Sequence, residues 1–445
     1  MEKIKYKKKN YIHFDRIKGI AESRKWIENP ENIVRHGFMP FIHFEQKSVK
    51  YSSMNGRKPK PRDLSYCSHI DAYIYQLYAH RLTGLYNENA KSRGINKCVV
   101  AYRNNFTGKC NIHFAHEVFR FIRNKGDCFV IIGDFTKFFD RLDHKYLKEQ
   151  CCNLLDVQML PDDYYKVFKS ITKYSYYELS DLIKLTDSKD FDEFNDREKR
   201  DIALPIEQFR EAKKKHLKKN RKNYGIPQGS PLSALFANTY MLDFDKAVNN
   251  FVTSNNGLYR RYSDDFVIVL PYNNKKIQSQ WQHINDIRKG IPNLDLQPDK
   301  TKVFHFAHGT ITSCDSLLFP DLPNGKNIID YLGFSFDGDK ISIRDKTVSK
   351  YYYRMNHRAS VVSRRSAGIG RKGKRPDYYG LYKKYSHFGA KPTKGNHGNF
   401  ITYVNRCIDV FGMDEKVHLV KQRHMRKINR IIKSKKRKNA PCEAS

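Results

Sequence analysis

Long hydrophobic runs are missing from this sequence, and so is any sign of a targeting segment. No stretch of the 445 residues approaches the ~18 consecutive apolar residues that a membrane-spanning helix needs. The first ten residues, Met-Glu-Lys-Ile-Lys-Tyr-Lys-Lys-Lys-Asn, lack the apolar core of a secretory signal peptide. We therefore expect a cytoplasmic protein without a membrane partner.

Cysteine is also scarce, with nine residues, an odd number, and no Cys-x-x-Cys pair. This usage is typical of scattered thiols in a reducing compartment, and it offers neither a disulfide framework nor a zinc site. Internal repeats and long low-complexity linkers are absent as well. The length allows two or three domains with sizeable cores.

Acidic residues are too few to balance the basic ones. Lys and Arg number 83 against 47 Asp and Glu, which gives a formal net charge of +36. Such a charge favours a polyanionic partner, above all nucleic acid, and a basic protein on a membrane surface is the alternative. The 29 Tyr and 28 Phe add rings on which unpaired bases can stack, although most aromatic residues of any chain lie in its core.

A short acidic hairpin is the most informative stretch of the chain. Two β-prone runs, Leu258–Ser263 and Phe266–Leu270, flank the adjacent carboxylates Asp264 and Asp265. Neighbouring carboxylates repel each other, and a divalent metal ion would cancel that repulsion. An ordinary Asp-rich turn is the alternative when the pair is considered alone.

A third carboxylate decides between these two interpretations. The apolar run Cys128–Asp134 predicts a buried strand that ends on Asp134. A lone buried charge at a strand end is costly unless a cation or a partner stabilises it. Asp134 is therefore the natural third ligand of a metal site with Asp264 and Asp265.

Other stretches predict elements around this site. The loop Tyr224–Ser233 is punctuated by Gly and Pro, and it enters an apolar helix whose N-terminus favours negative charge. Residues 156–223 read as helical and charged, with an acid-rich part followed by a basic run. Further expected elements are helices over Ala72–Leu85, His144–Leu155, Ala234–Val248 and Ile277–Arg288, a strand over Cys98–Arg103, and a hairpin at Tyr331–Phe336 with an Asp337-Gly338 turn.

Taken in order, these stretches resemble the reverse transcriptases, specifically the prokaryotic lineage that includes group II intron and retron enzymes. The segments Lys-Pro-Arg62 and Ala-Tyr-Arg103 are similar to the fingers motifs, and coverage is roughly residues 55–340. The segments similar to motifs A to E are Asp134-Phe-Thr-Lys-Phe-Phe-Asp140, Gly225-Ile-Pro-Gln-Gly-Ser-Pro-Leu-Ser233, Tyr262-Ser-Asp-Asp265, Leu296–Thr301 and Tyr331-Leu-Gly-Phe334.

This resemblance implies an α+β fold shaped as a right-hand polymerase, with fingers, a palm built on an antiparallel sheet, and a C-terminal all-helical thumb. The N-terminal extension either contacts nucleic acid or is a tail with a packing helix. The expected boundaries are a basic N-terminal extension over residues 1–50, fingers and palm over 51–345 (palm mainly 126–150 and 224–345), a basic helical thumb over 346–432 and a basic disordered tail over 433–445.

The resemblance also implies the chemistry. Asp134, Asp264 and Asp265 would hold two Mg²⁺ ions, with the backbone of Phe135 close to them. Such a metal pair stabilises the attacking and leaving oxygens of nucleotidyl transfer. Lys300 is the expected proton donor to pyrophosphate.

Further residues are expected to contact the nucleotide and the nucleic acid. Phe139 matches the steric gate that excludes a ribose 2′-hydroxyl and so favours dNTPs. The remaining expected contacts are Arg62, Arg103, Gln228 and Gly229 for the dNTP, and Tyr262, Gly333, Arg371, Lys372 and Lys374 for nucleic acid.

The type of reverse transcriptase is inferred by elimination. The chain shows no DNA-binding, endonuclease or RNase H region, its Asn111-Ile-His-Phe-Ala-His116 segment matches the retron pattern only in part, and Val-Thr-Gly is absent from the thumb. What remains is similar to the "unknown group" reverse transcriptases of bacterial antiphage defence. Some members of that class copy a companion noncoding RNA, so the expected partners are such an RNA template and its DNA product, with a host RNase or a phage-encoded trigger as further candidates. A host enzyme would have to remove the RNA, because no RNase H region is seen.

Three alternatives stay open at this point. The first is a retron or group II intron-type reverse transcriptase. The second is template-independent or protein-primed DNA synthesis, for which the many tyrosines offer no obvious primer. The third is an RNA-binding scaffold on an inactive polymerase fold, although a scaffold has no need of three metal-binding carboxylates.

Overall fold

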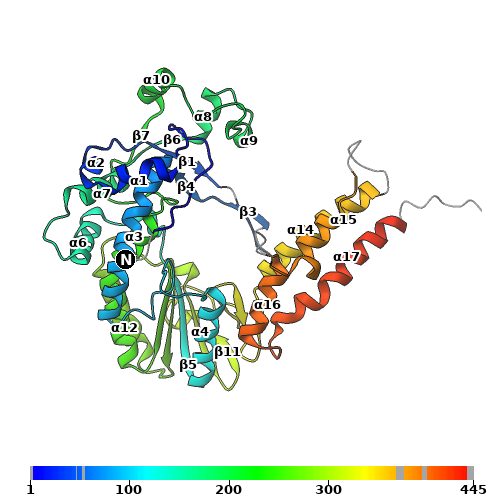
Figure 1. Cartoon of the computed structure of the whole chain (residues 1–445). Helices are drawn as coiled ribbons and strands as arrows, with labels where there is room; N and C mark the ends of the chain where they lie inside the picture. Colours follow the sequence, from blue (N-terminus) through cyan, green and yellow to red (C-terminus); the bar gives the residue numbers. More distant parts are fainter. Residues whose placement is uncertain (1–3, 47, 53–55, 367–374, 393–397, 438–445) are drawn as a thin grey trace, which may run out of the picture.

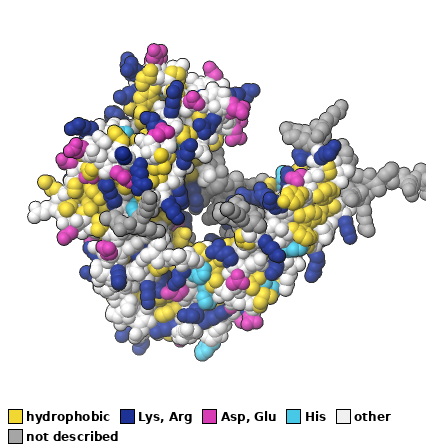
Figure 2. All heavy atoms as spheres, in the orientation of Figure 1, with side chains coloured by type: hydrophobic (Ala, Val, Ile, Leu, Met, Phe, Trp, Pro, Cys, Tyr) yellow, Lys and Arg dark blue, Asp and Glu magenta, His cyan; other side chains and the backbone are white. Residues whose placement is uncertain are grey.

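The computed structural model describes residues 4–46, 48–52, 56–366, 375–392 and 398–437 of the chain. A β-sheet flanked by helices forms the lower part of the molecule in Figure 1, a mixed α/β region forms the upper part, and helices α14 to α17 form an arm on the right. These three parts correspond to the expected palm, fingers and thumb. Figure 2 shows a hollow between the arm and the body, with Lys and Arg side chains spread over this face.

The palm is built on an antiparallel sheet with the strand order β11-β10-β5-β9-β8. Cys128 and Val130 of the central strand face helix α4, whereas Phe129 and Ile131 face the core that contains α12 and α13. Burial on both faces explains why this strand is a continuous apolar run. The palm strands are β5 (Cys128–Asp134), β8 (Leu258–Tyr262), β9 (Asp265–Pro271), β10 (Lys302–Ala307) and β11 (Thr310–Ser313).

Helices pack on both faces of this sheet. The palm helices are α4 (Asn111–Lys125), α5 (Phe138–Arg141), α11 (Ser233–Tyr240), α12 (Leu242–Ser254) and α13 (Ile277–Lys289). A small antiparallel sheet of β12 (Ile329–Tyr331), β13 (Phe334–Phe336) and β14 (Ile341–Ile343) packs in the same core as α4.

The fingers contain a mixed sheet with the strand order β4-β1-β6-β7 and a separate β2–β3 hairpin. The strands are β1 (Phe41–Glu45), β2 (Ser48–Ser52), β3 (Gly56–Lys60), β4 (Asp63–Tyr66), β6 (Ser175–Glu178) and β7 (Lys218–Lys219). The helices are α1 (Ile20–Glu28), α2 (Pro30–Arg35), α3 (His69–Ser92), α6 (His144–Leu155), α7 (Asp162–Thr172), α8 (Leu179–Leu185), α9 (Phe191–Phe194) and α10 (Ile206–His216).

The thumb helices are α14 (Asp345–Ser366), α15 (Tyr378–Tyr385), α16 (Phe400–Phe411) and α17 (Leu419–Arg437). Helices α14 and α17 pack side by side through buried residues that include Met355, Ala359 and Ile428. The arm is joined to the palm at α4, where Arg123 forms an ion pair with Glu415 at 2.7 Å. The predicted α+β class, with an antiparallel palm sheet and a helical thumb, is confirmed.

Several local expectations were wrong. Residues 98–103, expected to be a strand, form a loop with an isolated bridge from Val99 to Arg261. The Cys98 carbonyl and the Val100 amide both bond to Arg261, and this bridge does not extend into a continuous strand pair. The helix expected over Ala234–Val248 is broken at Met241 into α11 and α12. The stretch 156–223, expected to be helical, also supplies strands β6 and β7 to the fingers.

The ends of the chain also differ from the expected boundaries. Residues 1–50 do not stand apart, since β1 pairs with both β4 and β6 in the fingers sheet and His13 and Phe14 are buried in the core beside it. At the other end, α17 continues to Arg437, so residues 433–437 of the expected tail are helical. The remaining domain boundaries stay predictions.

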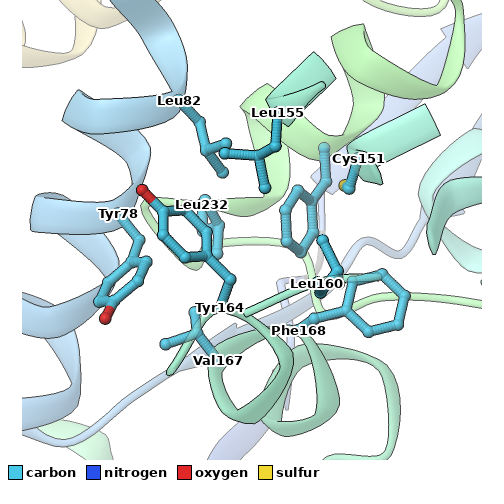
Figure 3. Close-up of a pocket in the computed structure, with 10 residues that line it drawn as sticks. Tyr78, Leu82, Cys151, Leu155, Leu160, Tyr164, Val167, Phe168 and Leu232 are labelled. Carbon is cyan, nitrogen blue, oxygen red and sulfur yellow. The ribbon is translucent and has the colours of Figure 1, made fainter. Parts of the chain in front are cut away.

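A small apolar pocket lies between α3, α6, α7 and the loop that enters α11 (Figure 3). Tyr78, Tyr164 and Phe168 contribute rings to its wall, and no carboxylate lines it. It belongs to the packing of the fingers on the palm and not to the acidic site described below. Within the described residues, no helix is long and apolar enough to cross a membrane.

Candidate active site

The acidic site forms where two neighbouring palm strands meet. Asp134, the last residue of β5, lies directly opposite Asp265, the first residue of β9. Asp265 also pairs with Tyr262 across a two-residue turn, Ser263-Asp264. The turn is therefore one residue earlier than expected, because Asp265 belongs to the strand. The Phe135 amide donates to the Asp264 carbonyl at 3.3 Å, so backbone hydrogen bonds bring the three aspartate residues to the same edge of the sheet.

A buried ion pair between Arg261 and Asp245 holds this turn in place. Ser263 has a left-handed φ of 62°, which is unfavourable for a residue with a side chain. Arg261 donates to its carbonyl at 2.8 Å, and the same guanidinium forms a two-pronged bond with Asp245 at 2.8 and 2.7 Å. Both side chains are completely buried. Burial alone would lower the pKa of Arg261, but Asp245 outweighs that effect and the pKa is raised.

Desolvation and neighbouring negative charge both disfavour the ionised forms of Asp264 and Asp265. Burial raises the pKa of Asp264, and repulsion from Asp134 raises it further. The pKa of Asp265 is raised to about 7, first by desolvation and then by the charges of Asp264 and Asp134. Lys300 and Arg344 partly offset this repulsion. The site therefore needs additional positive charge to keep its carboxylates ionised near neutral pH.

Lys300 supplies part of that charge. Its ammonium group lies 2.5 Å from Asp134 Oδ2, whereas the buried Oδ1 of the same carboxylate has no hydrogen-bond partner. The short helical turn Pro298–Lys300 is held at the end of β5, because the Gln297 amide donates to the Asp134 carbonyl at 2.9 Å. This contact brings the segment similar to motif D to the acidic site.

The donor set fits a hard divalent cation. Carboxylate oxygens are the ligands that Mg²⁺ prefers, Oδ1 of Asp134 lacks a partner, and the charges of Asp264 and Asp134 add to the desolvation that raises the pKa of Asp265. As they stand, no three His, Cys, Asp or Glu side chains among the described residues are gathered closely enough to hold one ion. The Lys300 ammonium group occupies one oxygen of Asp134 in this arrangement.

The glycine loop contacts the fingers beside the acidic site. The Gln228 carbonyl accepts a 2.7 Å hydrogen bond from the amide of Ser65 in β4. Gly229 has a φ of 115°, and a Cβ there would lie 2.4 Å from the Ser65 carbonyl oxygen, so only glycine fits. Gln228 Nε2 also reaches Asp140 Oδ1 at 3.4 Å, and the Phe139 carbonyl accepts from the Ile226 amide at 2.9 Å. These contacts bring the segments similar to motifs A and B together.

A second tight turn lies between β12 and β13. Leu332 and Gly333 both have positive φ, 45° and 94°, and they connect the paired residues Tyr331 and Phe334. Asn111 of α4 donates to the Leu332 carbonyl at 2.9 Å. The sequence predicted only the Asp337-Gly338 turn, which lies between β13 and β14, and missed the Leu332-Gly333 turn.

Comparison with known proteins decides the family. Residues 79–336, more than half of the chain, match the family described as reverse transcriptase (RNA-dependent DNA polymerase). This protein belongs to the reverse transcriptase family. The matched range contains the Asp134, Asp264 and Asp265 cluster, the glycine loop and the Leu332-Gly333 turn. No match was found among curated proteins.

Solved structures similar to this reverse transcriptase family member include telomerases and an RNA polymerase. An apo telomerase from Candida tropicalis, truncated at its C-terminal domain, is 12% identical, with 72% of this chain and 59% of that chain covered and a TM-score of 0.40. A Candida albicans telomerase with a fragment of telomeric RNA is 13% identical, with 93% and 65% covered and a TM-score of 0.39.

The RNA-dependent RNA polymerase of a human picobirnavirus is 10% identical, with 90% of this chain and 58% of that chain covered and a TM-score of 0.42. The present chain thus spans about three fifths to two thirds of the length of these relatives. No functional conclusion follows from similarity at this level.

Two arginines of the reverse transcriptase motifs have different surroundings. Arg62 is exposed, and its backbone pairs with Gln46 beside the fingers sheet. Arg103 is half-buried and donates to Asn87, Asn96 and the Val99 carbonyl. Burial lowers the pKa of Arg103, and a triphosphate contact would require it to leave these partners. Arg371, Lys372 and Lys374 lie outside the described residues.

Three residues around the acidic turn were missed from the sequence, two that hold the turn and one that contacts it from a neighbouring loop. Arg261 and Asp245 form the ion pair below the turn, and Tyr102 donates its hydroxyl to Ser263 Oγ at 3.2 Å. An arginine inside the apolar stretch Leu258–Leu270 was a signal of a buried partner, since an unpaired buried charge is costly. The Ala-Tyr-Arg103 segment was noted only for its arginine.

Proposed function

We propose that this protein is an RNA-directed DNA polymerase that adds deoxynucleotides from dNTPs to a hydroxyl acceptor. The observation that carries the proposal is the meeting of Asp134, Asp264 and Asp265 at the ends of paired strands, beside a glycine loop joined to the fingers. The family match over residues 79–336 supports the same reaction. A nucleotidyl transfer of this kind needs concentrated negative charge opposite a triphosphate, with cations between them.

The protein's own residues would divide the work as follows. Asp134, Asp264 and Asp265 would hold Mg²⁺, which when bound stabilises the attacking and leaving oxygens. Lys300 already lies at this cluster, so its ammonium group can donate a proton to the departing pyrophosphate. The Phe135 backbone anchors the Asp264 turn.

Phe139 would select the sugar of the incoming nucleotide. Its ring packs partly buried against Phe138 at 5.6 Å, and its carbonyl is fixed by Ile226 of the glycine loop. A ring held in this way has little freedom to move aside for an extra 2′-oxygen. Gln228 and Gly229, joined to Ser65 of the fingers, would line the opposite side of the nucleotide site.

The template and product follow from charge and family. A net charge of +36 suits an RNA template paired with its DNA copy, and Tyr262, Gly333 and the thumb cations are the proposed contacts. Binding of this type weakens steeply with salt because it releases counterions. An affinity for primed RNA that stays flat between low and high salt would contradict a phosphate-based interface.

The finer assignment is a bacterial antiphage defence enzyme that copies a companion noncoding RNA in the cytoplasm. The support for this assignment is the resemblance to stand-alone defence reverse transcriptases. It is tested by sequencing the RNA and DNA that co-purify with wild type and with Asp264→Ala/Asp265→Ala. One small RNA in both samples, with complementary DNA in wild type alone, is the expected result. RNA without DNA even under phage challenge would favour an RNA-binding scaffold, and DNA without a matching RNA would indicate untemplated synthesis.

The reaction itself is tested with purified protein, Mg²⁺, dNTPs and a primed RNA, with the co-purifying RNA also tried. We expect extension by wild type and by Asp286→Ala, which removes an exposed carboxylate on α13, but none by Asp264→Ala. Absence of extension by wild type on both RNAs would refute the proposed reaction. Equal extension by wild type and Asp264→Ala would refute the role of the carboxylate cluster.

A stability measurement separates loss of chemistry from loss of folding. The ionised form of Asp265 is disfavoured in the folded protein, because its pKa is raised to about 7 from its ordinary value of 3.8. Its charge therefore costs stability as the pH rises through this window. Measured at a pH above 7, Asp265→Asn should have a higher denaturation midpoint than the wild type and should lose primer extension. A folding defect would lower the denaturation midpoint as well as primer extension.

A further inference from the structure

Tyr102 is the tyrosine whose hydroxyl reaches the acidic turn. It lies in the loop between α3 and α4, its side chain is 49% exposed, and its hydroxyl donates to Ser263 Oγ at 3.2 Å. Ser263 directly precedes Asp264. Two other tyrosines near the turn do not offer a free hydroxyl, since Tyr259 is buried and donates to Asp245, and Tyr331 is buried as well. Tyr262, which directly precedes the turn, is half-buried, so mapping of the labelled peptide must distinguish it from Tyr102.

The backbone at Tyr102 is held in an unusual conformation. Its φ is 58°, a left-handed value that costs a residue with a side chain about 1–2 kcal/mol. Contacts on both sides maintain this conformation. The buried side chain of Asn238 donates to the Ala101 carbonyl at 3.0 Å, and the Arg103 guanidinium is held by Asn87 and Asn96. Strain that the surroundings enforce in this way is concentrated at functional positions.

The loop is also fastened to the strand that carries the acidic turn. The Val100 amide donates to the Arg261 carbonyl at 3.0 Å, and the Arg261 amide donates to the Cys98 carbonyl at 2.7 Å. The loop is thus bonded to the strand residue whose guanidinium supports Ser263. These bonds hold the backbone of the Tyr102 loop beside the strand that leads to Asp264.

We propose that the Tyr102 hydroxyl is the acceptor for the first nucleotide, so that the protein starts a DNA strand on its own side chain. This inference rests on the proposed polymerase function. It is argued from geometry: a polymerase transfers nucleotides to a hydroxyl near its acidic cluster, and the half-exposed Tyr102 places its hydroxyl on Ser263, the residue next to Asp264.

The chemical step is balanced with a dNTP as the only co-reactant. The phenolic oxygen attacks the α-phosphorus and forms a new oxygen–phosphorus bond, while the bond from that phosphorus to the bridging oxygen of the β-phosphate breaks. Pyrophosphate leaves, and the phenolic proton passes to solvent. The product is a deoxynucleoside 5′-phosphate ester of tyrosine, whose free 3′-hydroxyl can accept the next nucleotide.

The full-length protein is tested with each α-³²P-labelled dNTP and Mg²⁺, without primer, followed by denaturing electrophoresis and mass-spectrometric mapping of the labelled peptide. We expect a nucleotide on Tyr102 in the wild type. Tyr102→Phe keeps the ring and should lose the label while still extending an annealed DNA primer on RNA. Tyr272→Phe is the matched control, since Tyr272 is 42% exposed but stacks on His305 at the far end of β9, and it should keep both activities.

Two results would overturn the inference alone. One is unchanged labelling of Tyr102→Phe or a label mapped to another residue. The other is a wild-type protein that extends an annealed primer on RNA but takes up no label with any dNTP. If wild type neither extends a primer nor takes up label, the proposed function fails together with this inference.

Discussion

The ion pair between Arg261 and Asp245 is a sharp test of how the acidic turn is held. Both side chains are completely buried, and Asp245 accepts from Arg261 through two nitrogens and from the Tyr259 hydroxyl at 2.7 Å. Asp245→Ala removes one carboxylate and leaves these donors buried without an acceptor. Removing one partner of a buried pair costs about 3–5 kcal/mol, because the other charge stays behind uncompensated.

The measurement is urea denaturation of the wild type and two variants, monitored by circular dichroism. We expect Asp245→Ala to lose about 3–5 kcal/mol of unfolding free energy, whereas Asp286→Ala, which breaks an exposed pair with Lys289, should lose less than about 1 kcal/mol. A loss for Asp245→Ala as small as that of Asp286→Ala would show that the pair does not hold the turn.

Activity adds a second readout. Arg261 also donates to the Ser263 carbonyl, so misplacing its guanidinium should move Asp264 as well as destabilise the fold. Asp245→Asn keeps the size of the side chain and one acceptor oxygen, and we expect a smaller loss of stability than for alanine. Primer extension by this variant, assayed well below its denaturation midpoint, should still fall, and unchanged extension would refute the positioning role.

Three further predictions concern single side chains. Gly229→Ala places a Cβ 2.4 Å from the Ser65 carbonyl and should cost about 1–3 kcal/mol and lower primer extension, whereas Gly37→Ala, with open space around it, should do neither. Phe139→Ala should weaken the preference for dNTPs over NTPs on the order of 10- to 200-fold in single-nucleotide extension, and an unchanged preference would contradict its role as the sugar gate. Burial lowers the pKa of His13 from 6.5 to about 4, so on acidification the unfolded chain binds a proton at a higher pH than the folded protein does. The contribution of His13 to stability should therefore be complete above pH 6.5, and the free energy of unfolding should fall by up to ~1.4 kcal/mol per pH unit toward pH 4. His13→Phe should flatten this decline in acid denaturation, and an equally steep decline would exclude His13 as its source.

Some elements were readable from the sequence because local pattern fixes them. Strand β5 and helix α6 were expected over Cys128–Asp134 and His144–Leu155, and the structure has these bounds. A continuous apolar run that ends on Asp, and an amphipathic stretch whose Asp143 side chain caps the helix, are signals carried by neighbouring residues. The β8–β9 hairpin was also expected from local pattern, although its turn lies one residue earlier than predicted.

Other elements were misread because their partners lie far away in the chain. Cys98–Arg103 has the composition of a strand, yet its backbone groups bond to Arg261 of β8 and to the Asn238 side chain, and it remains a loop. The N-terminal stretch has weak periodicity, but Phe41–Glu45 is pinned between β4 and β6. Hydrogen bonds between residues more than a hundred positions apart in the chain, such as those of Cys98 with Arg261, cannot be recognised from the pattern of neighbouring residues.

The sequence by itself determined the basic charge, the apolar palm strands and the three carboxylates at their ends, since these depend on residue type and near spacing. Only the tertiary structure decided that Asp134 lies opposite Asp265, that Asp245 neutralises Arg261, and that Tyr102 reaches Ser263. Each of these contacts joins segments from different parts of the chain. Their geometry depends on how strands and helices pack, and packing is a property of the whole fold.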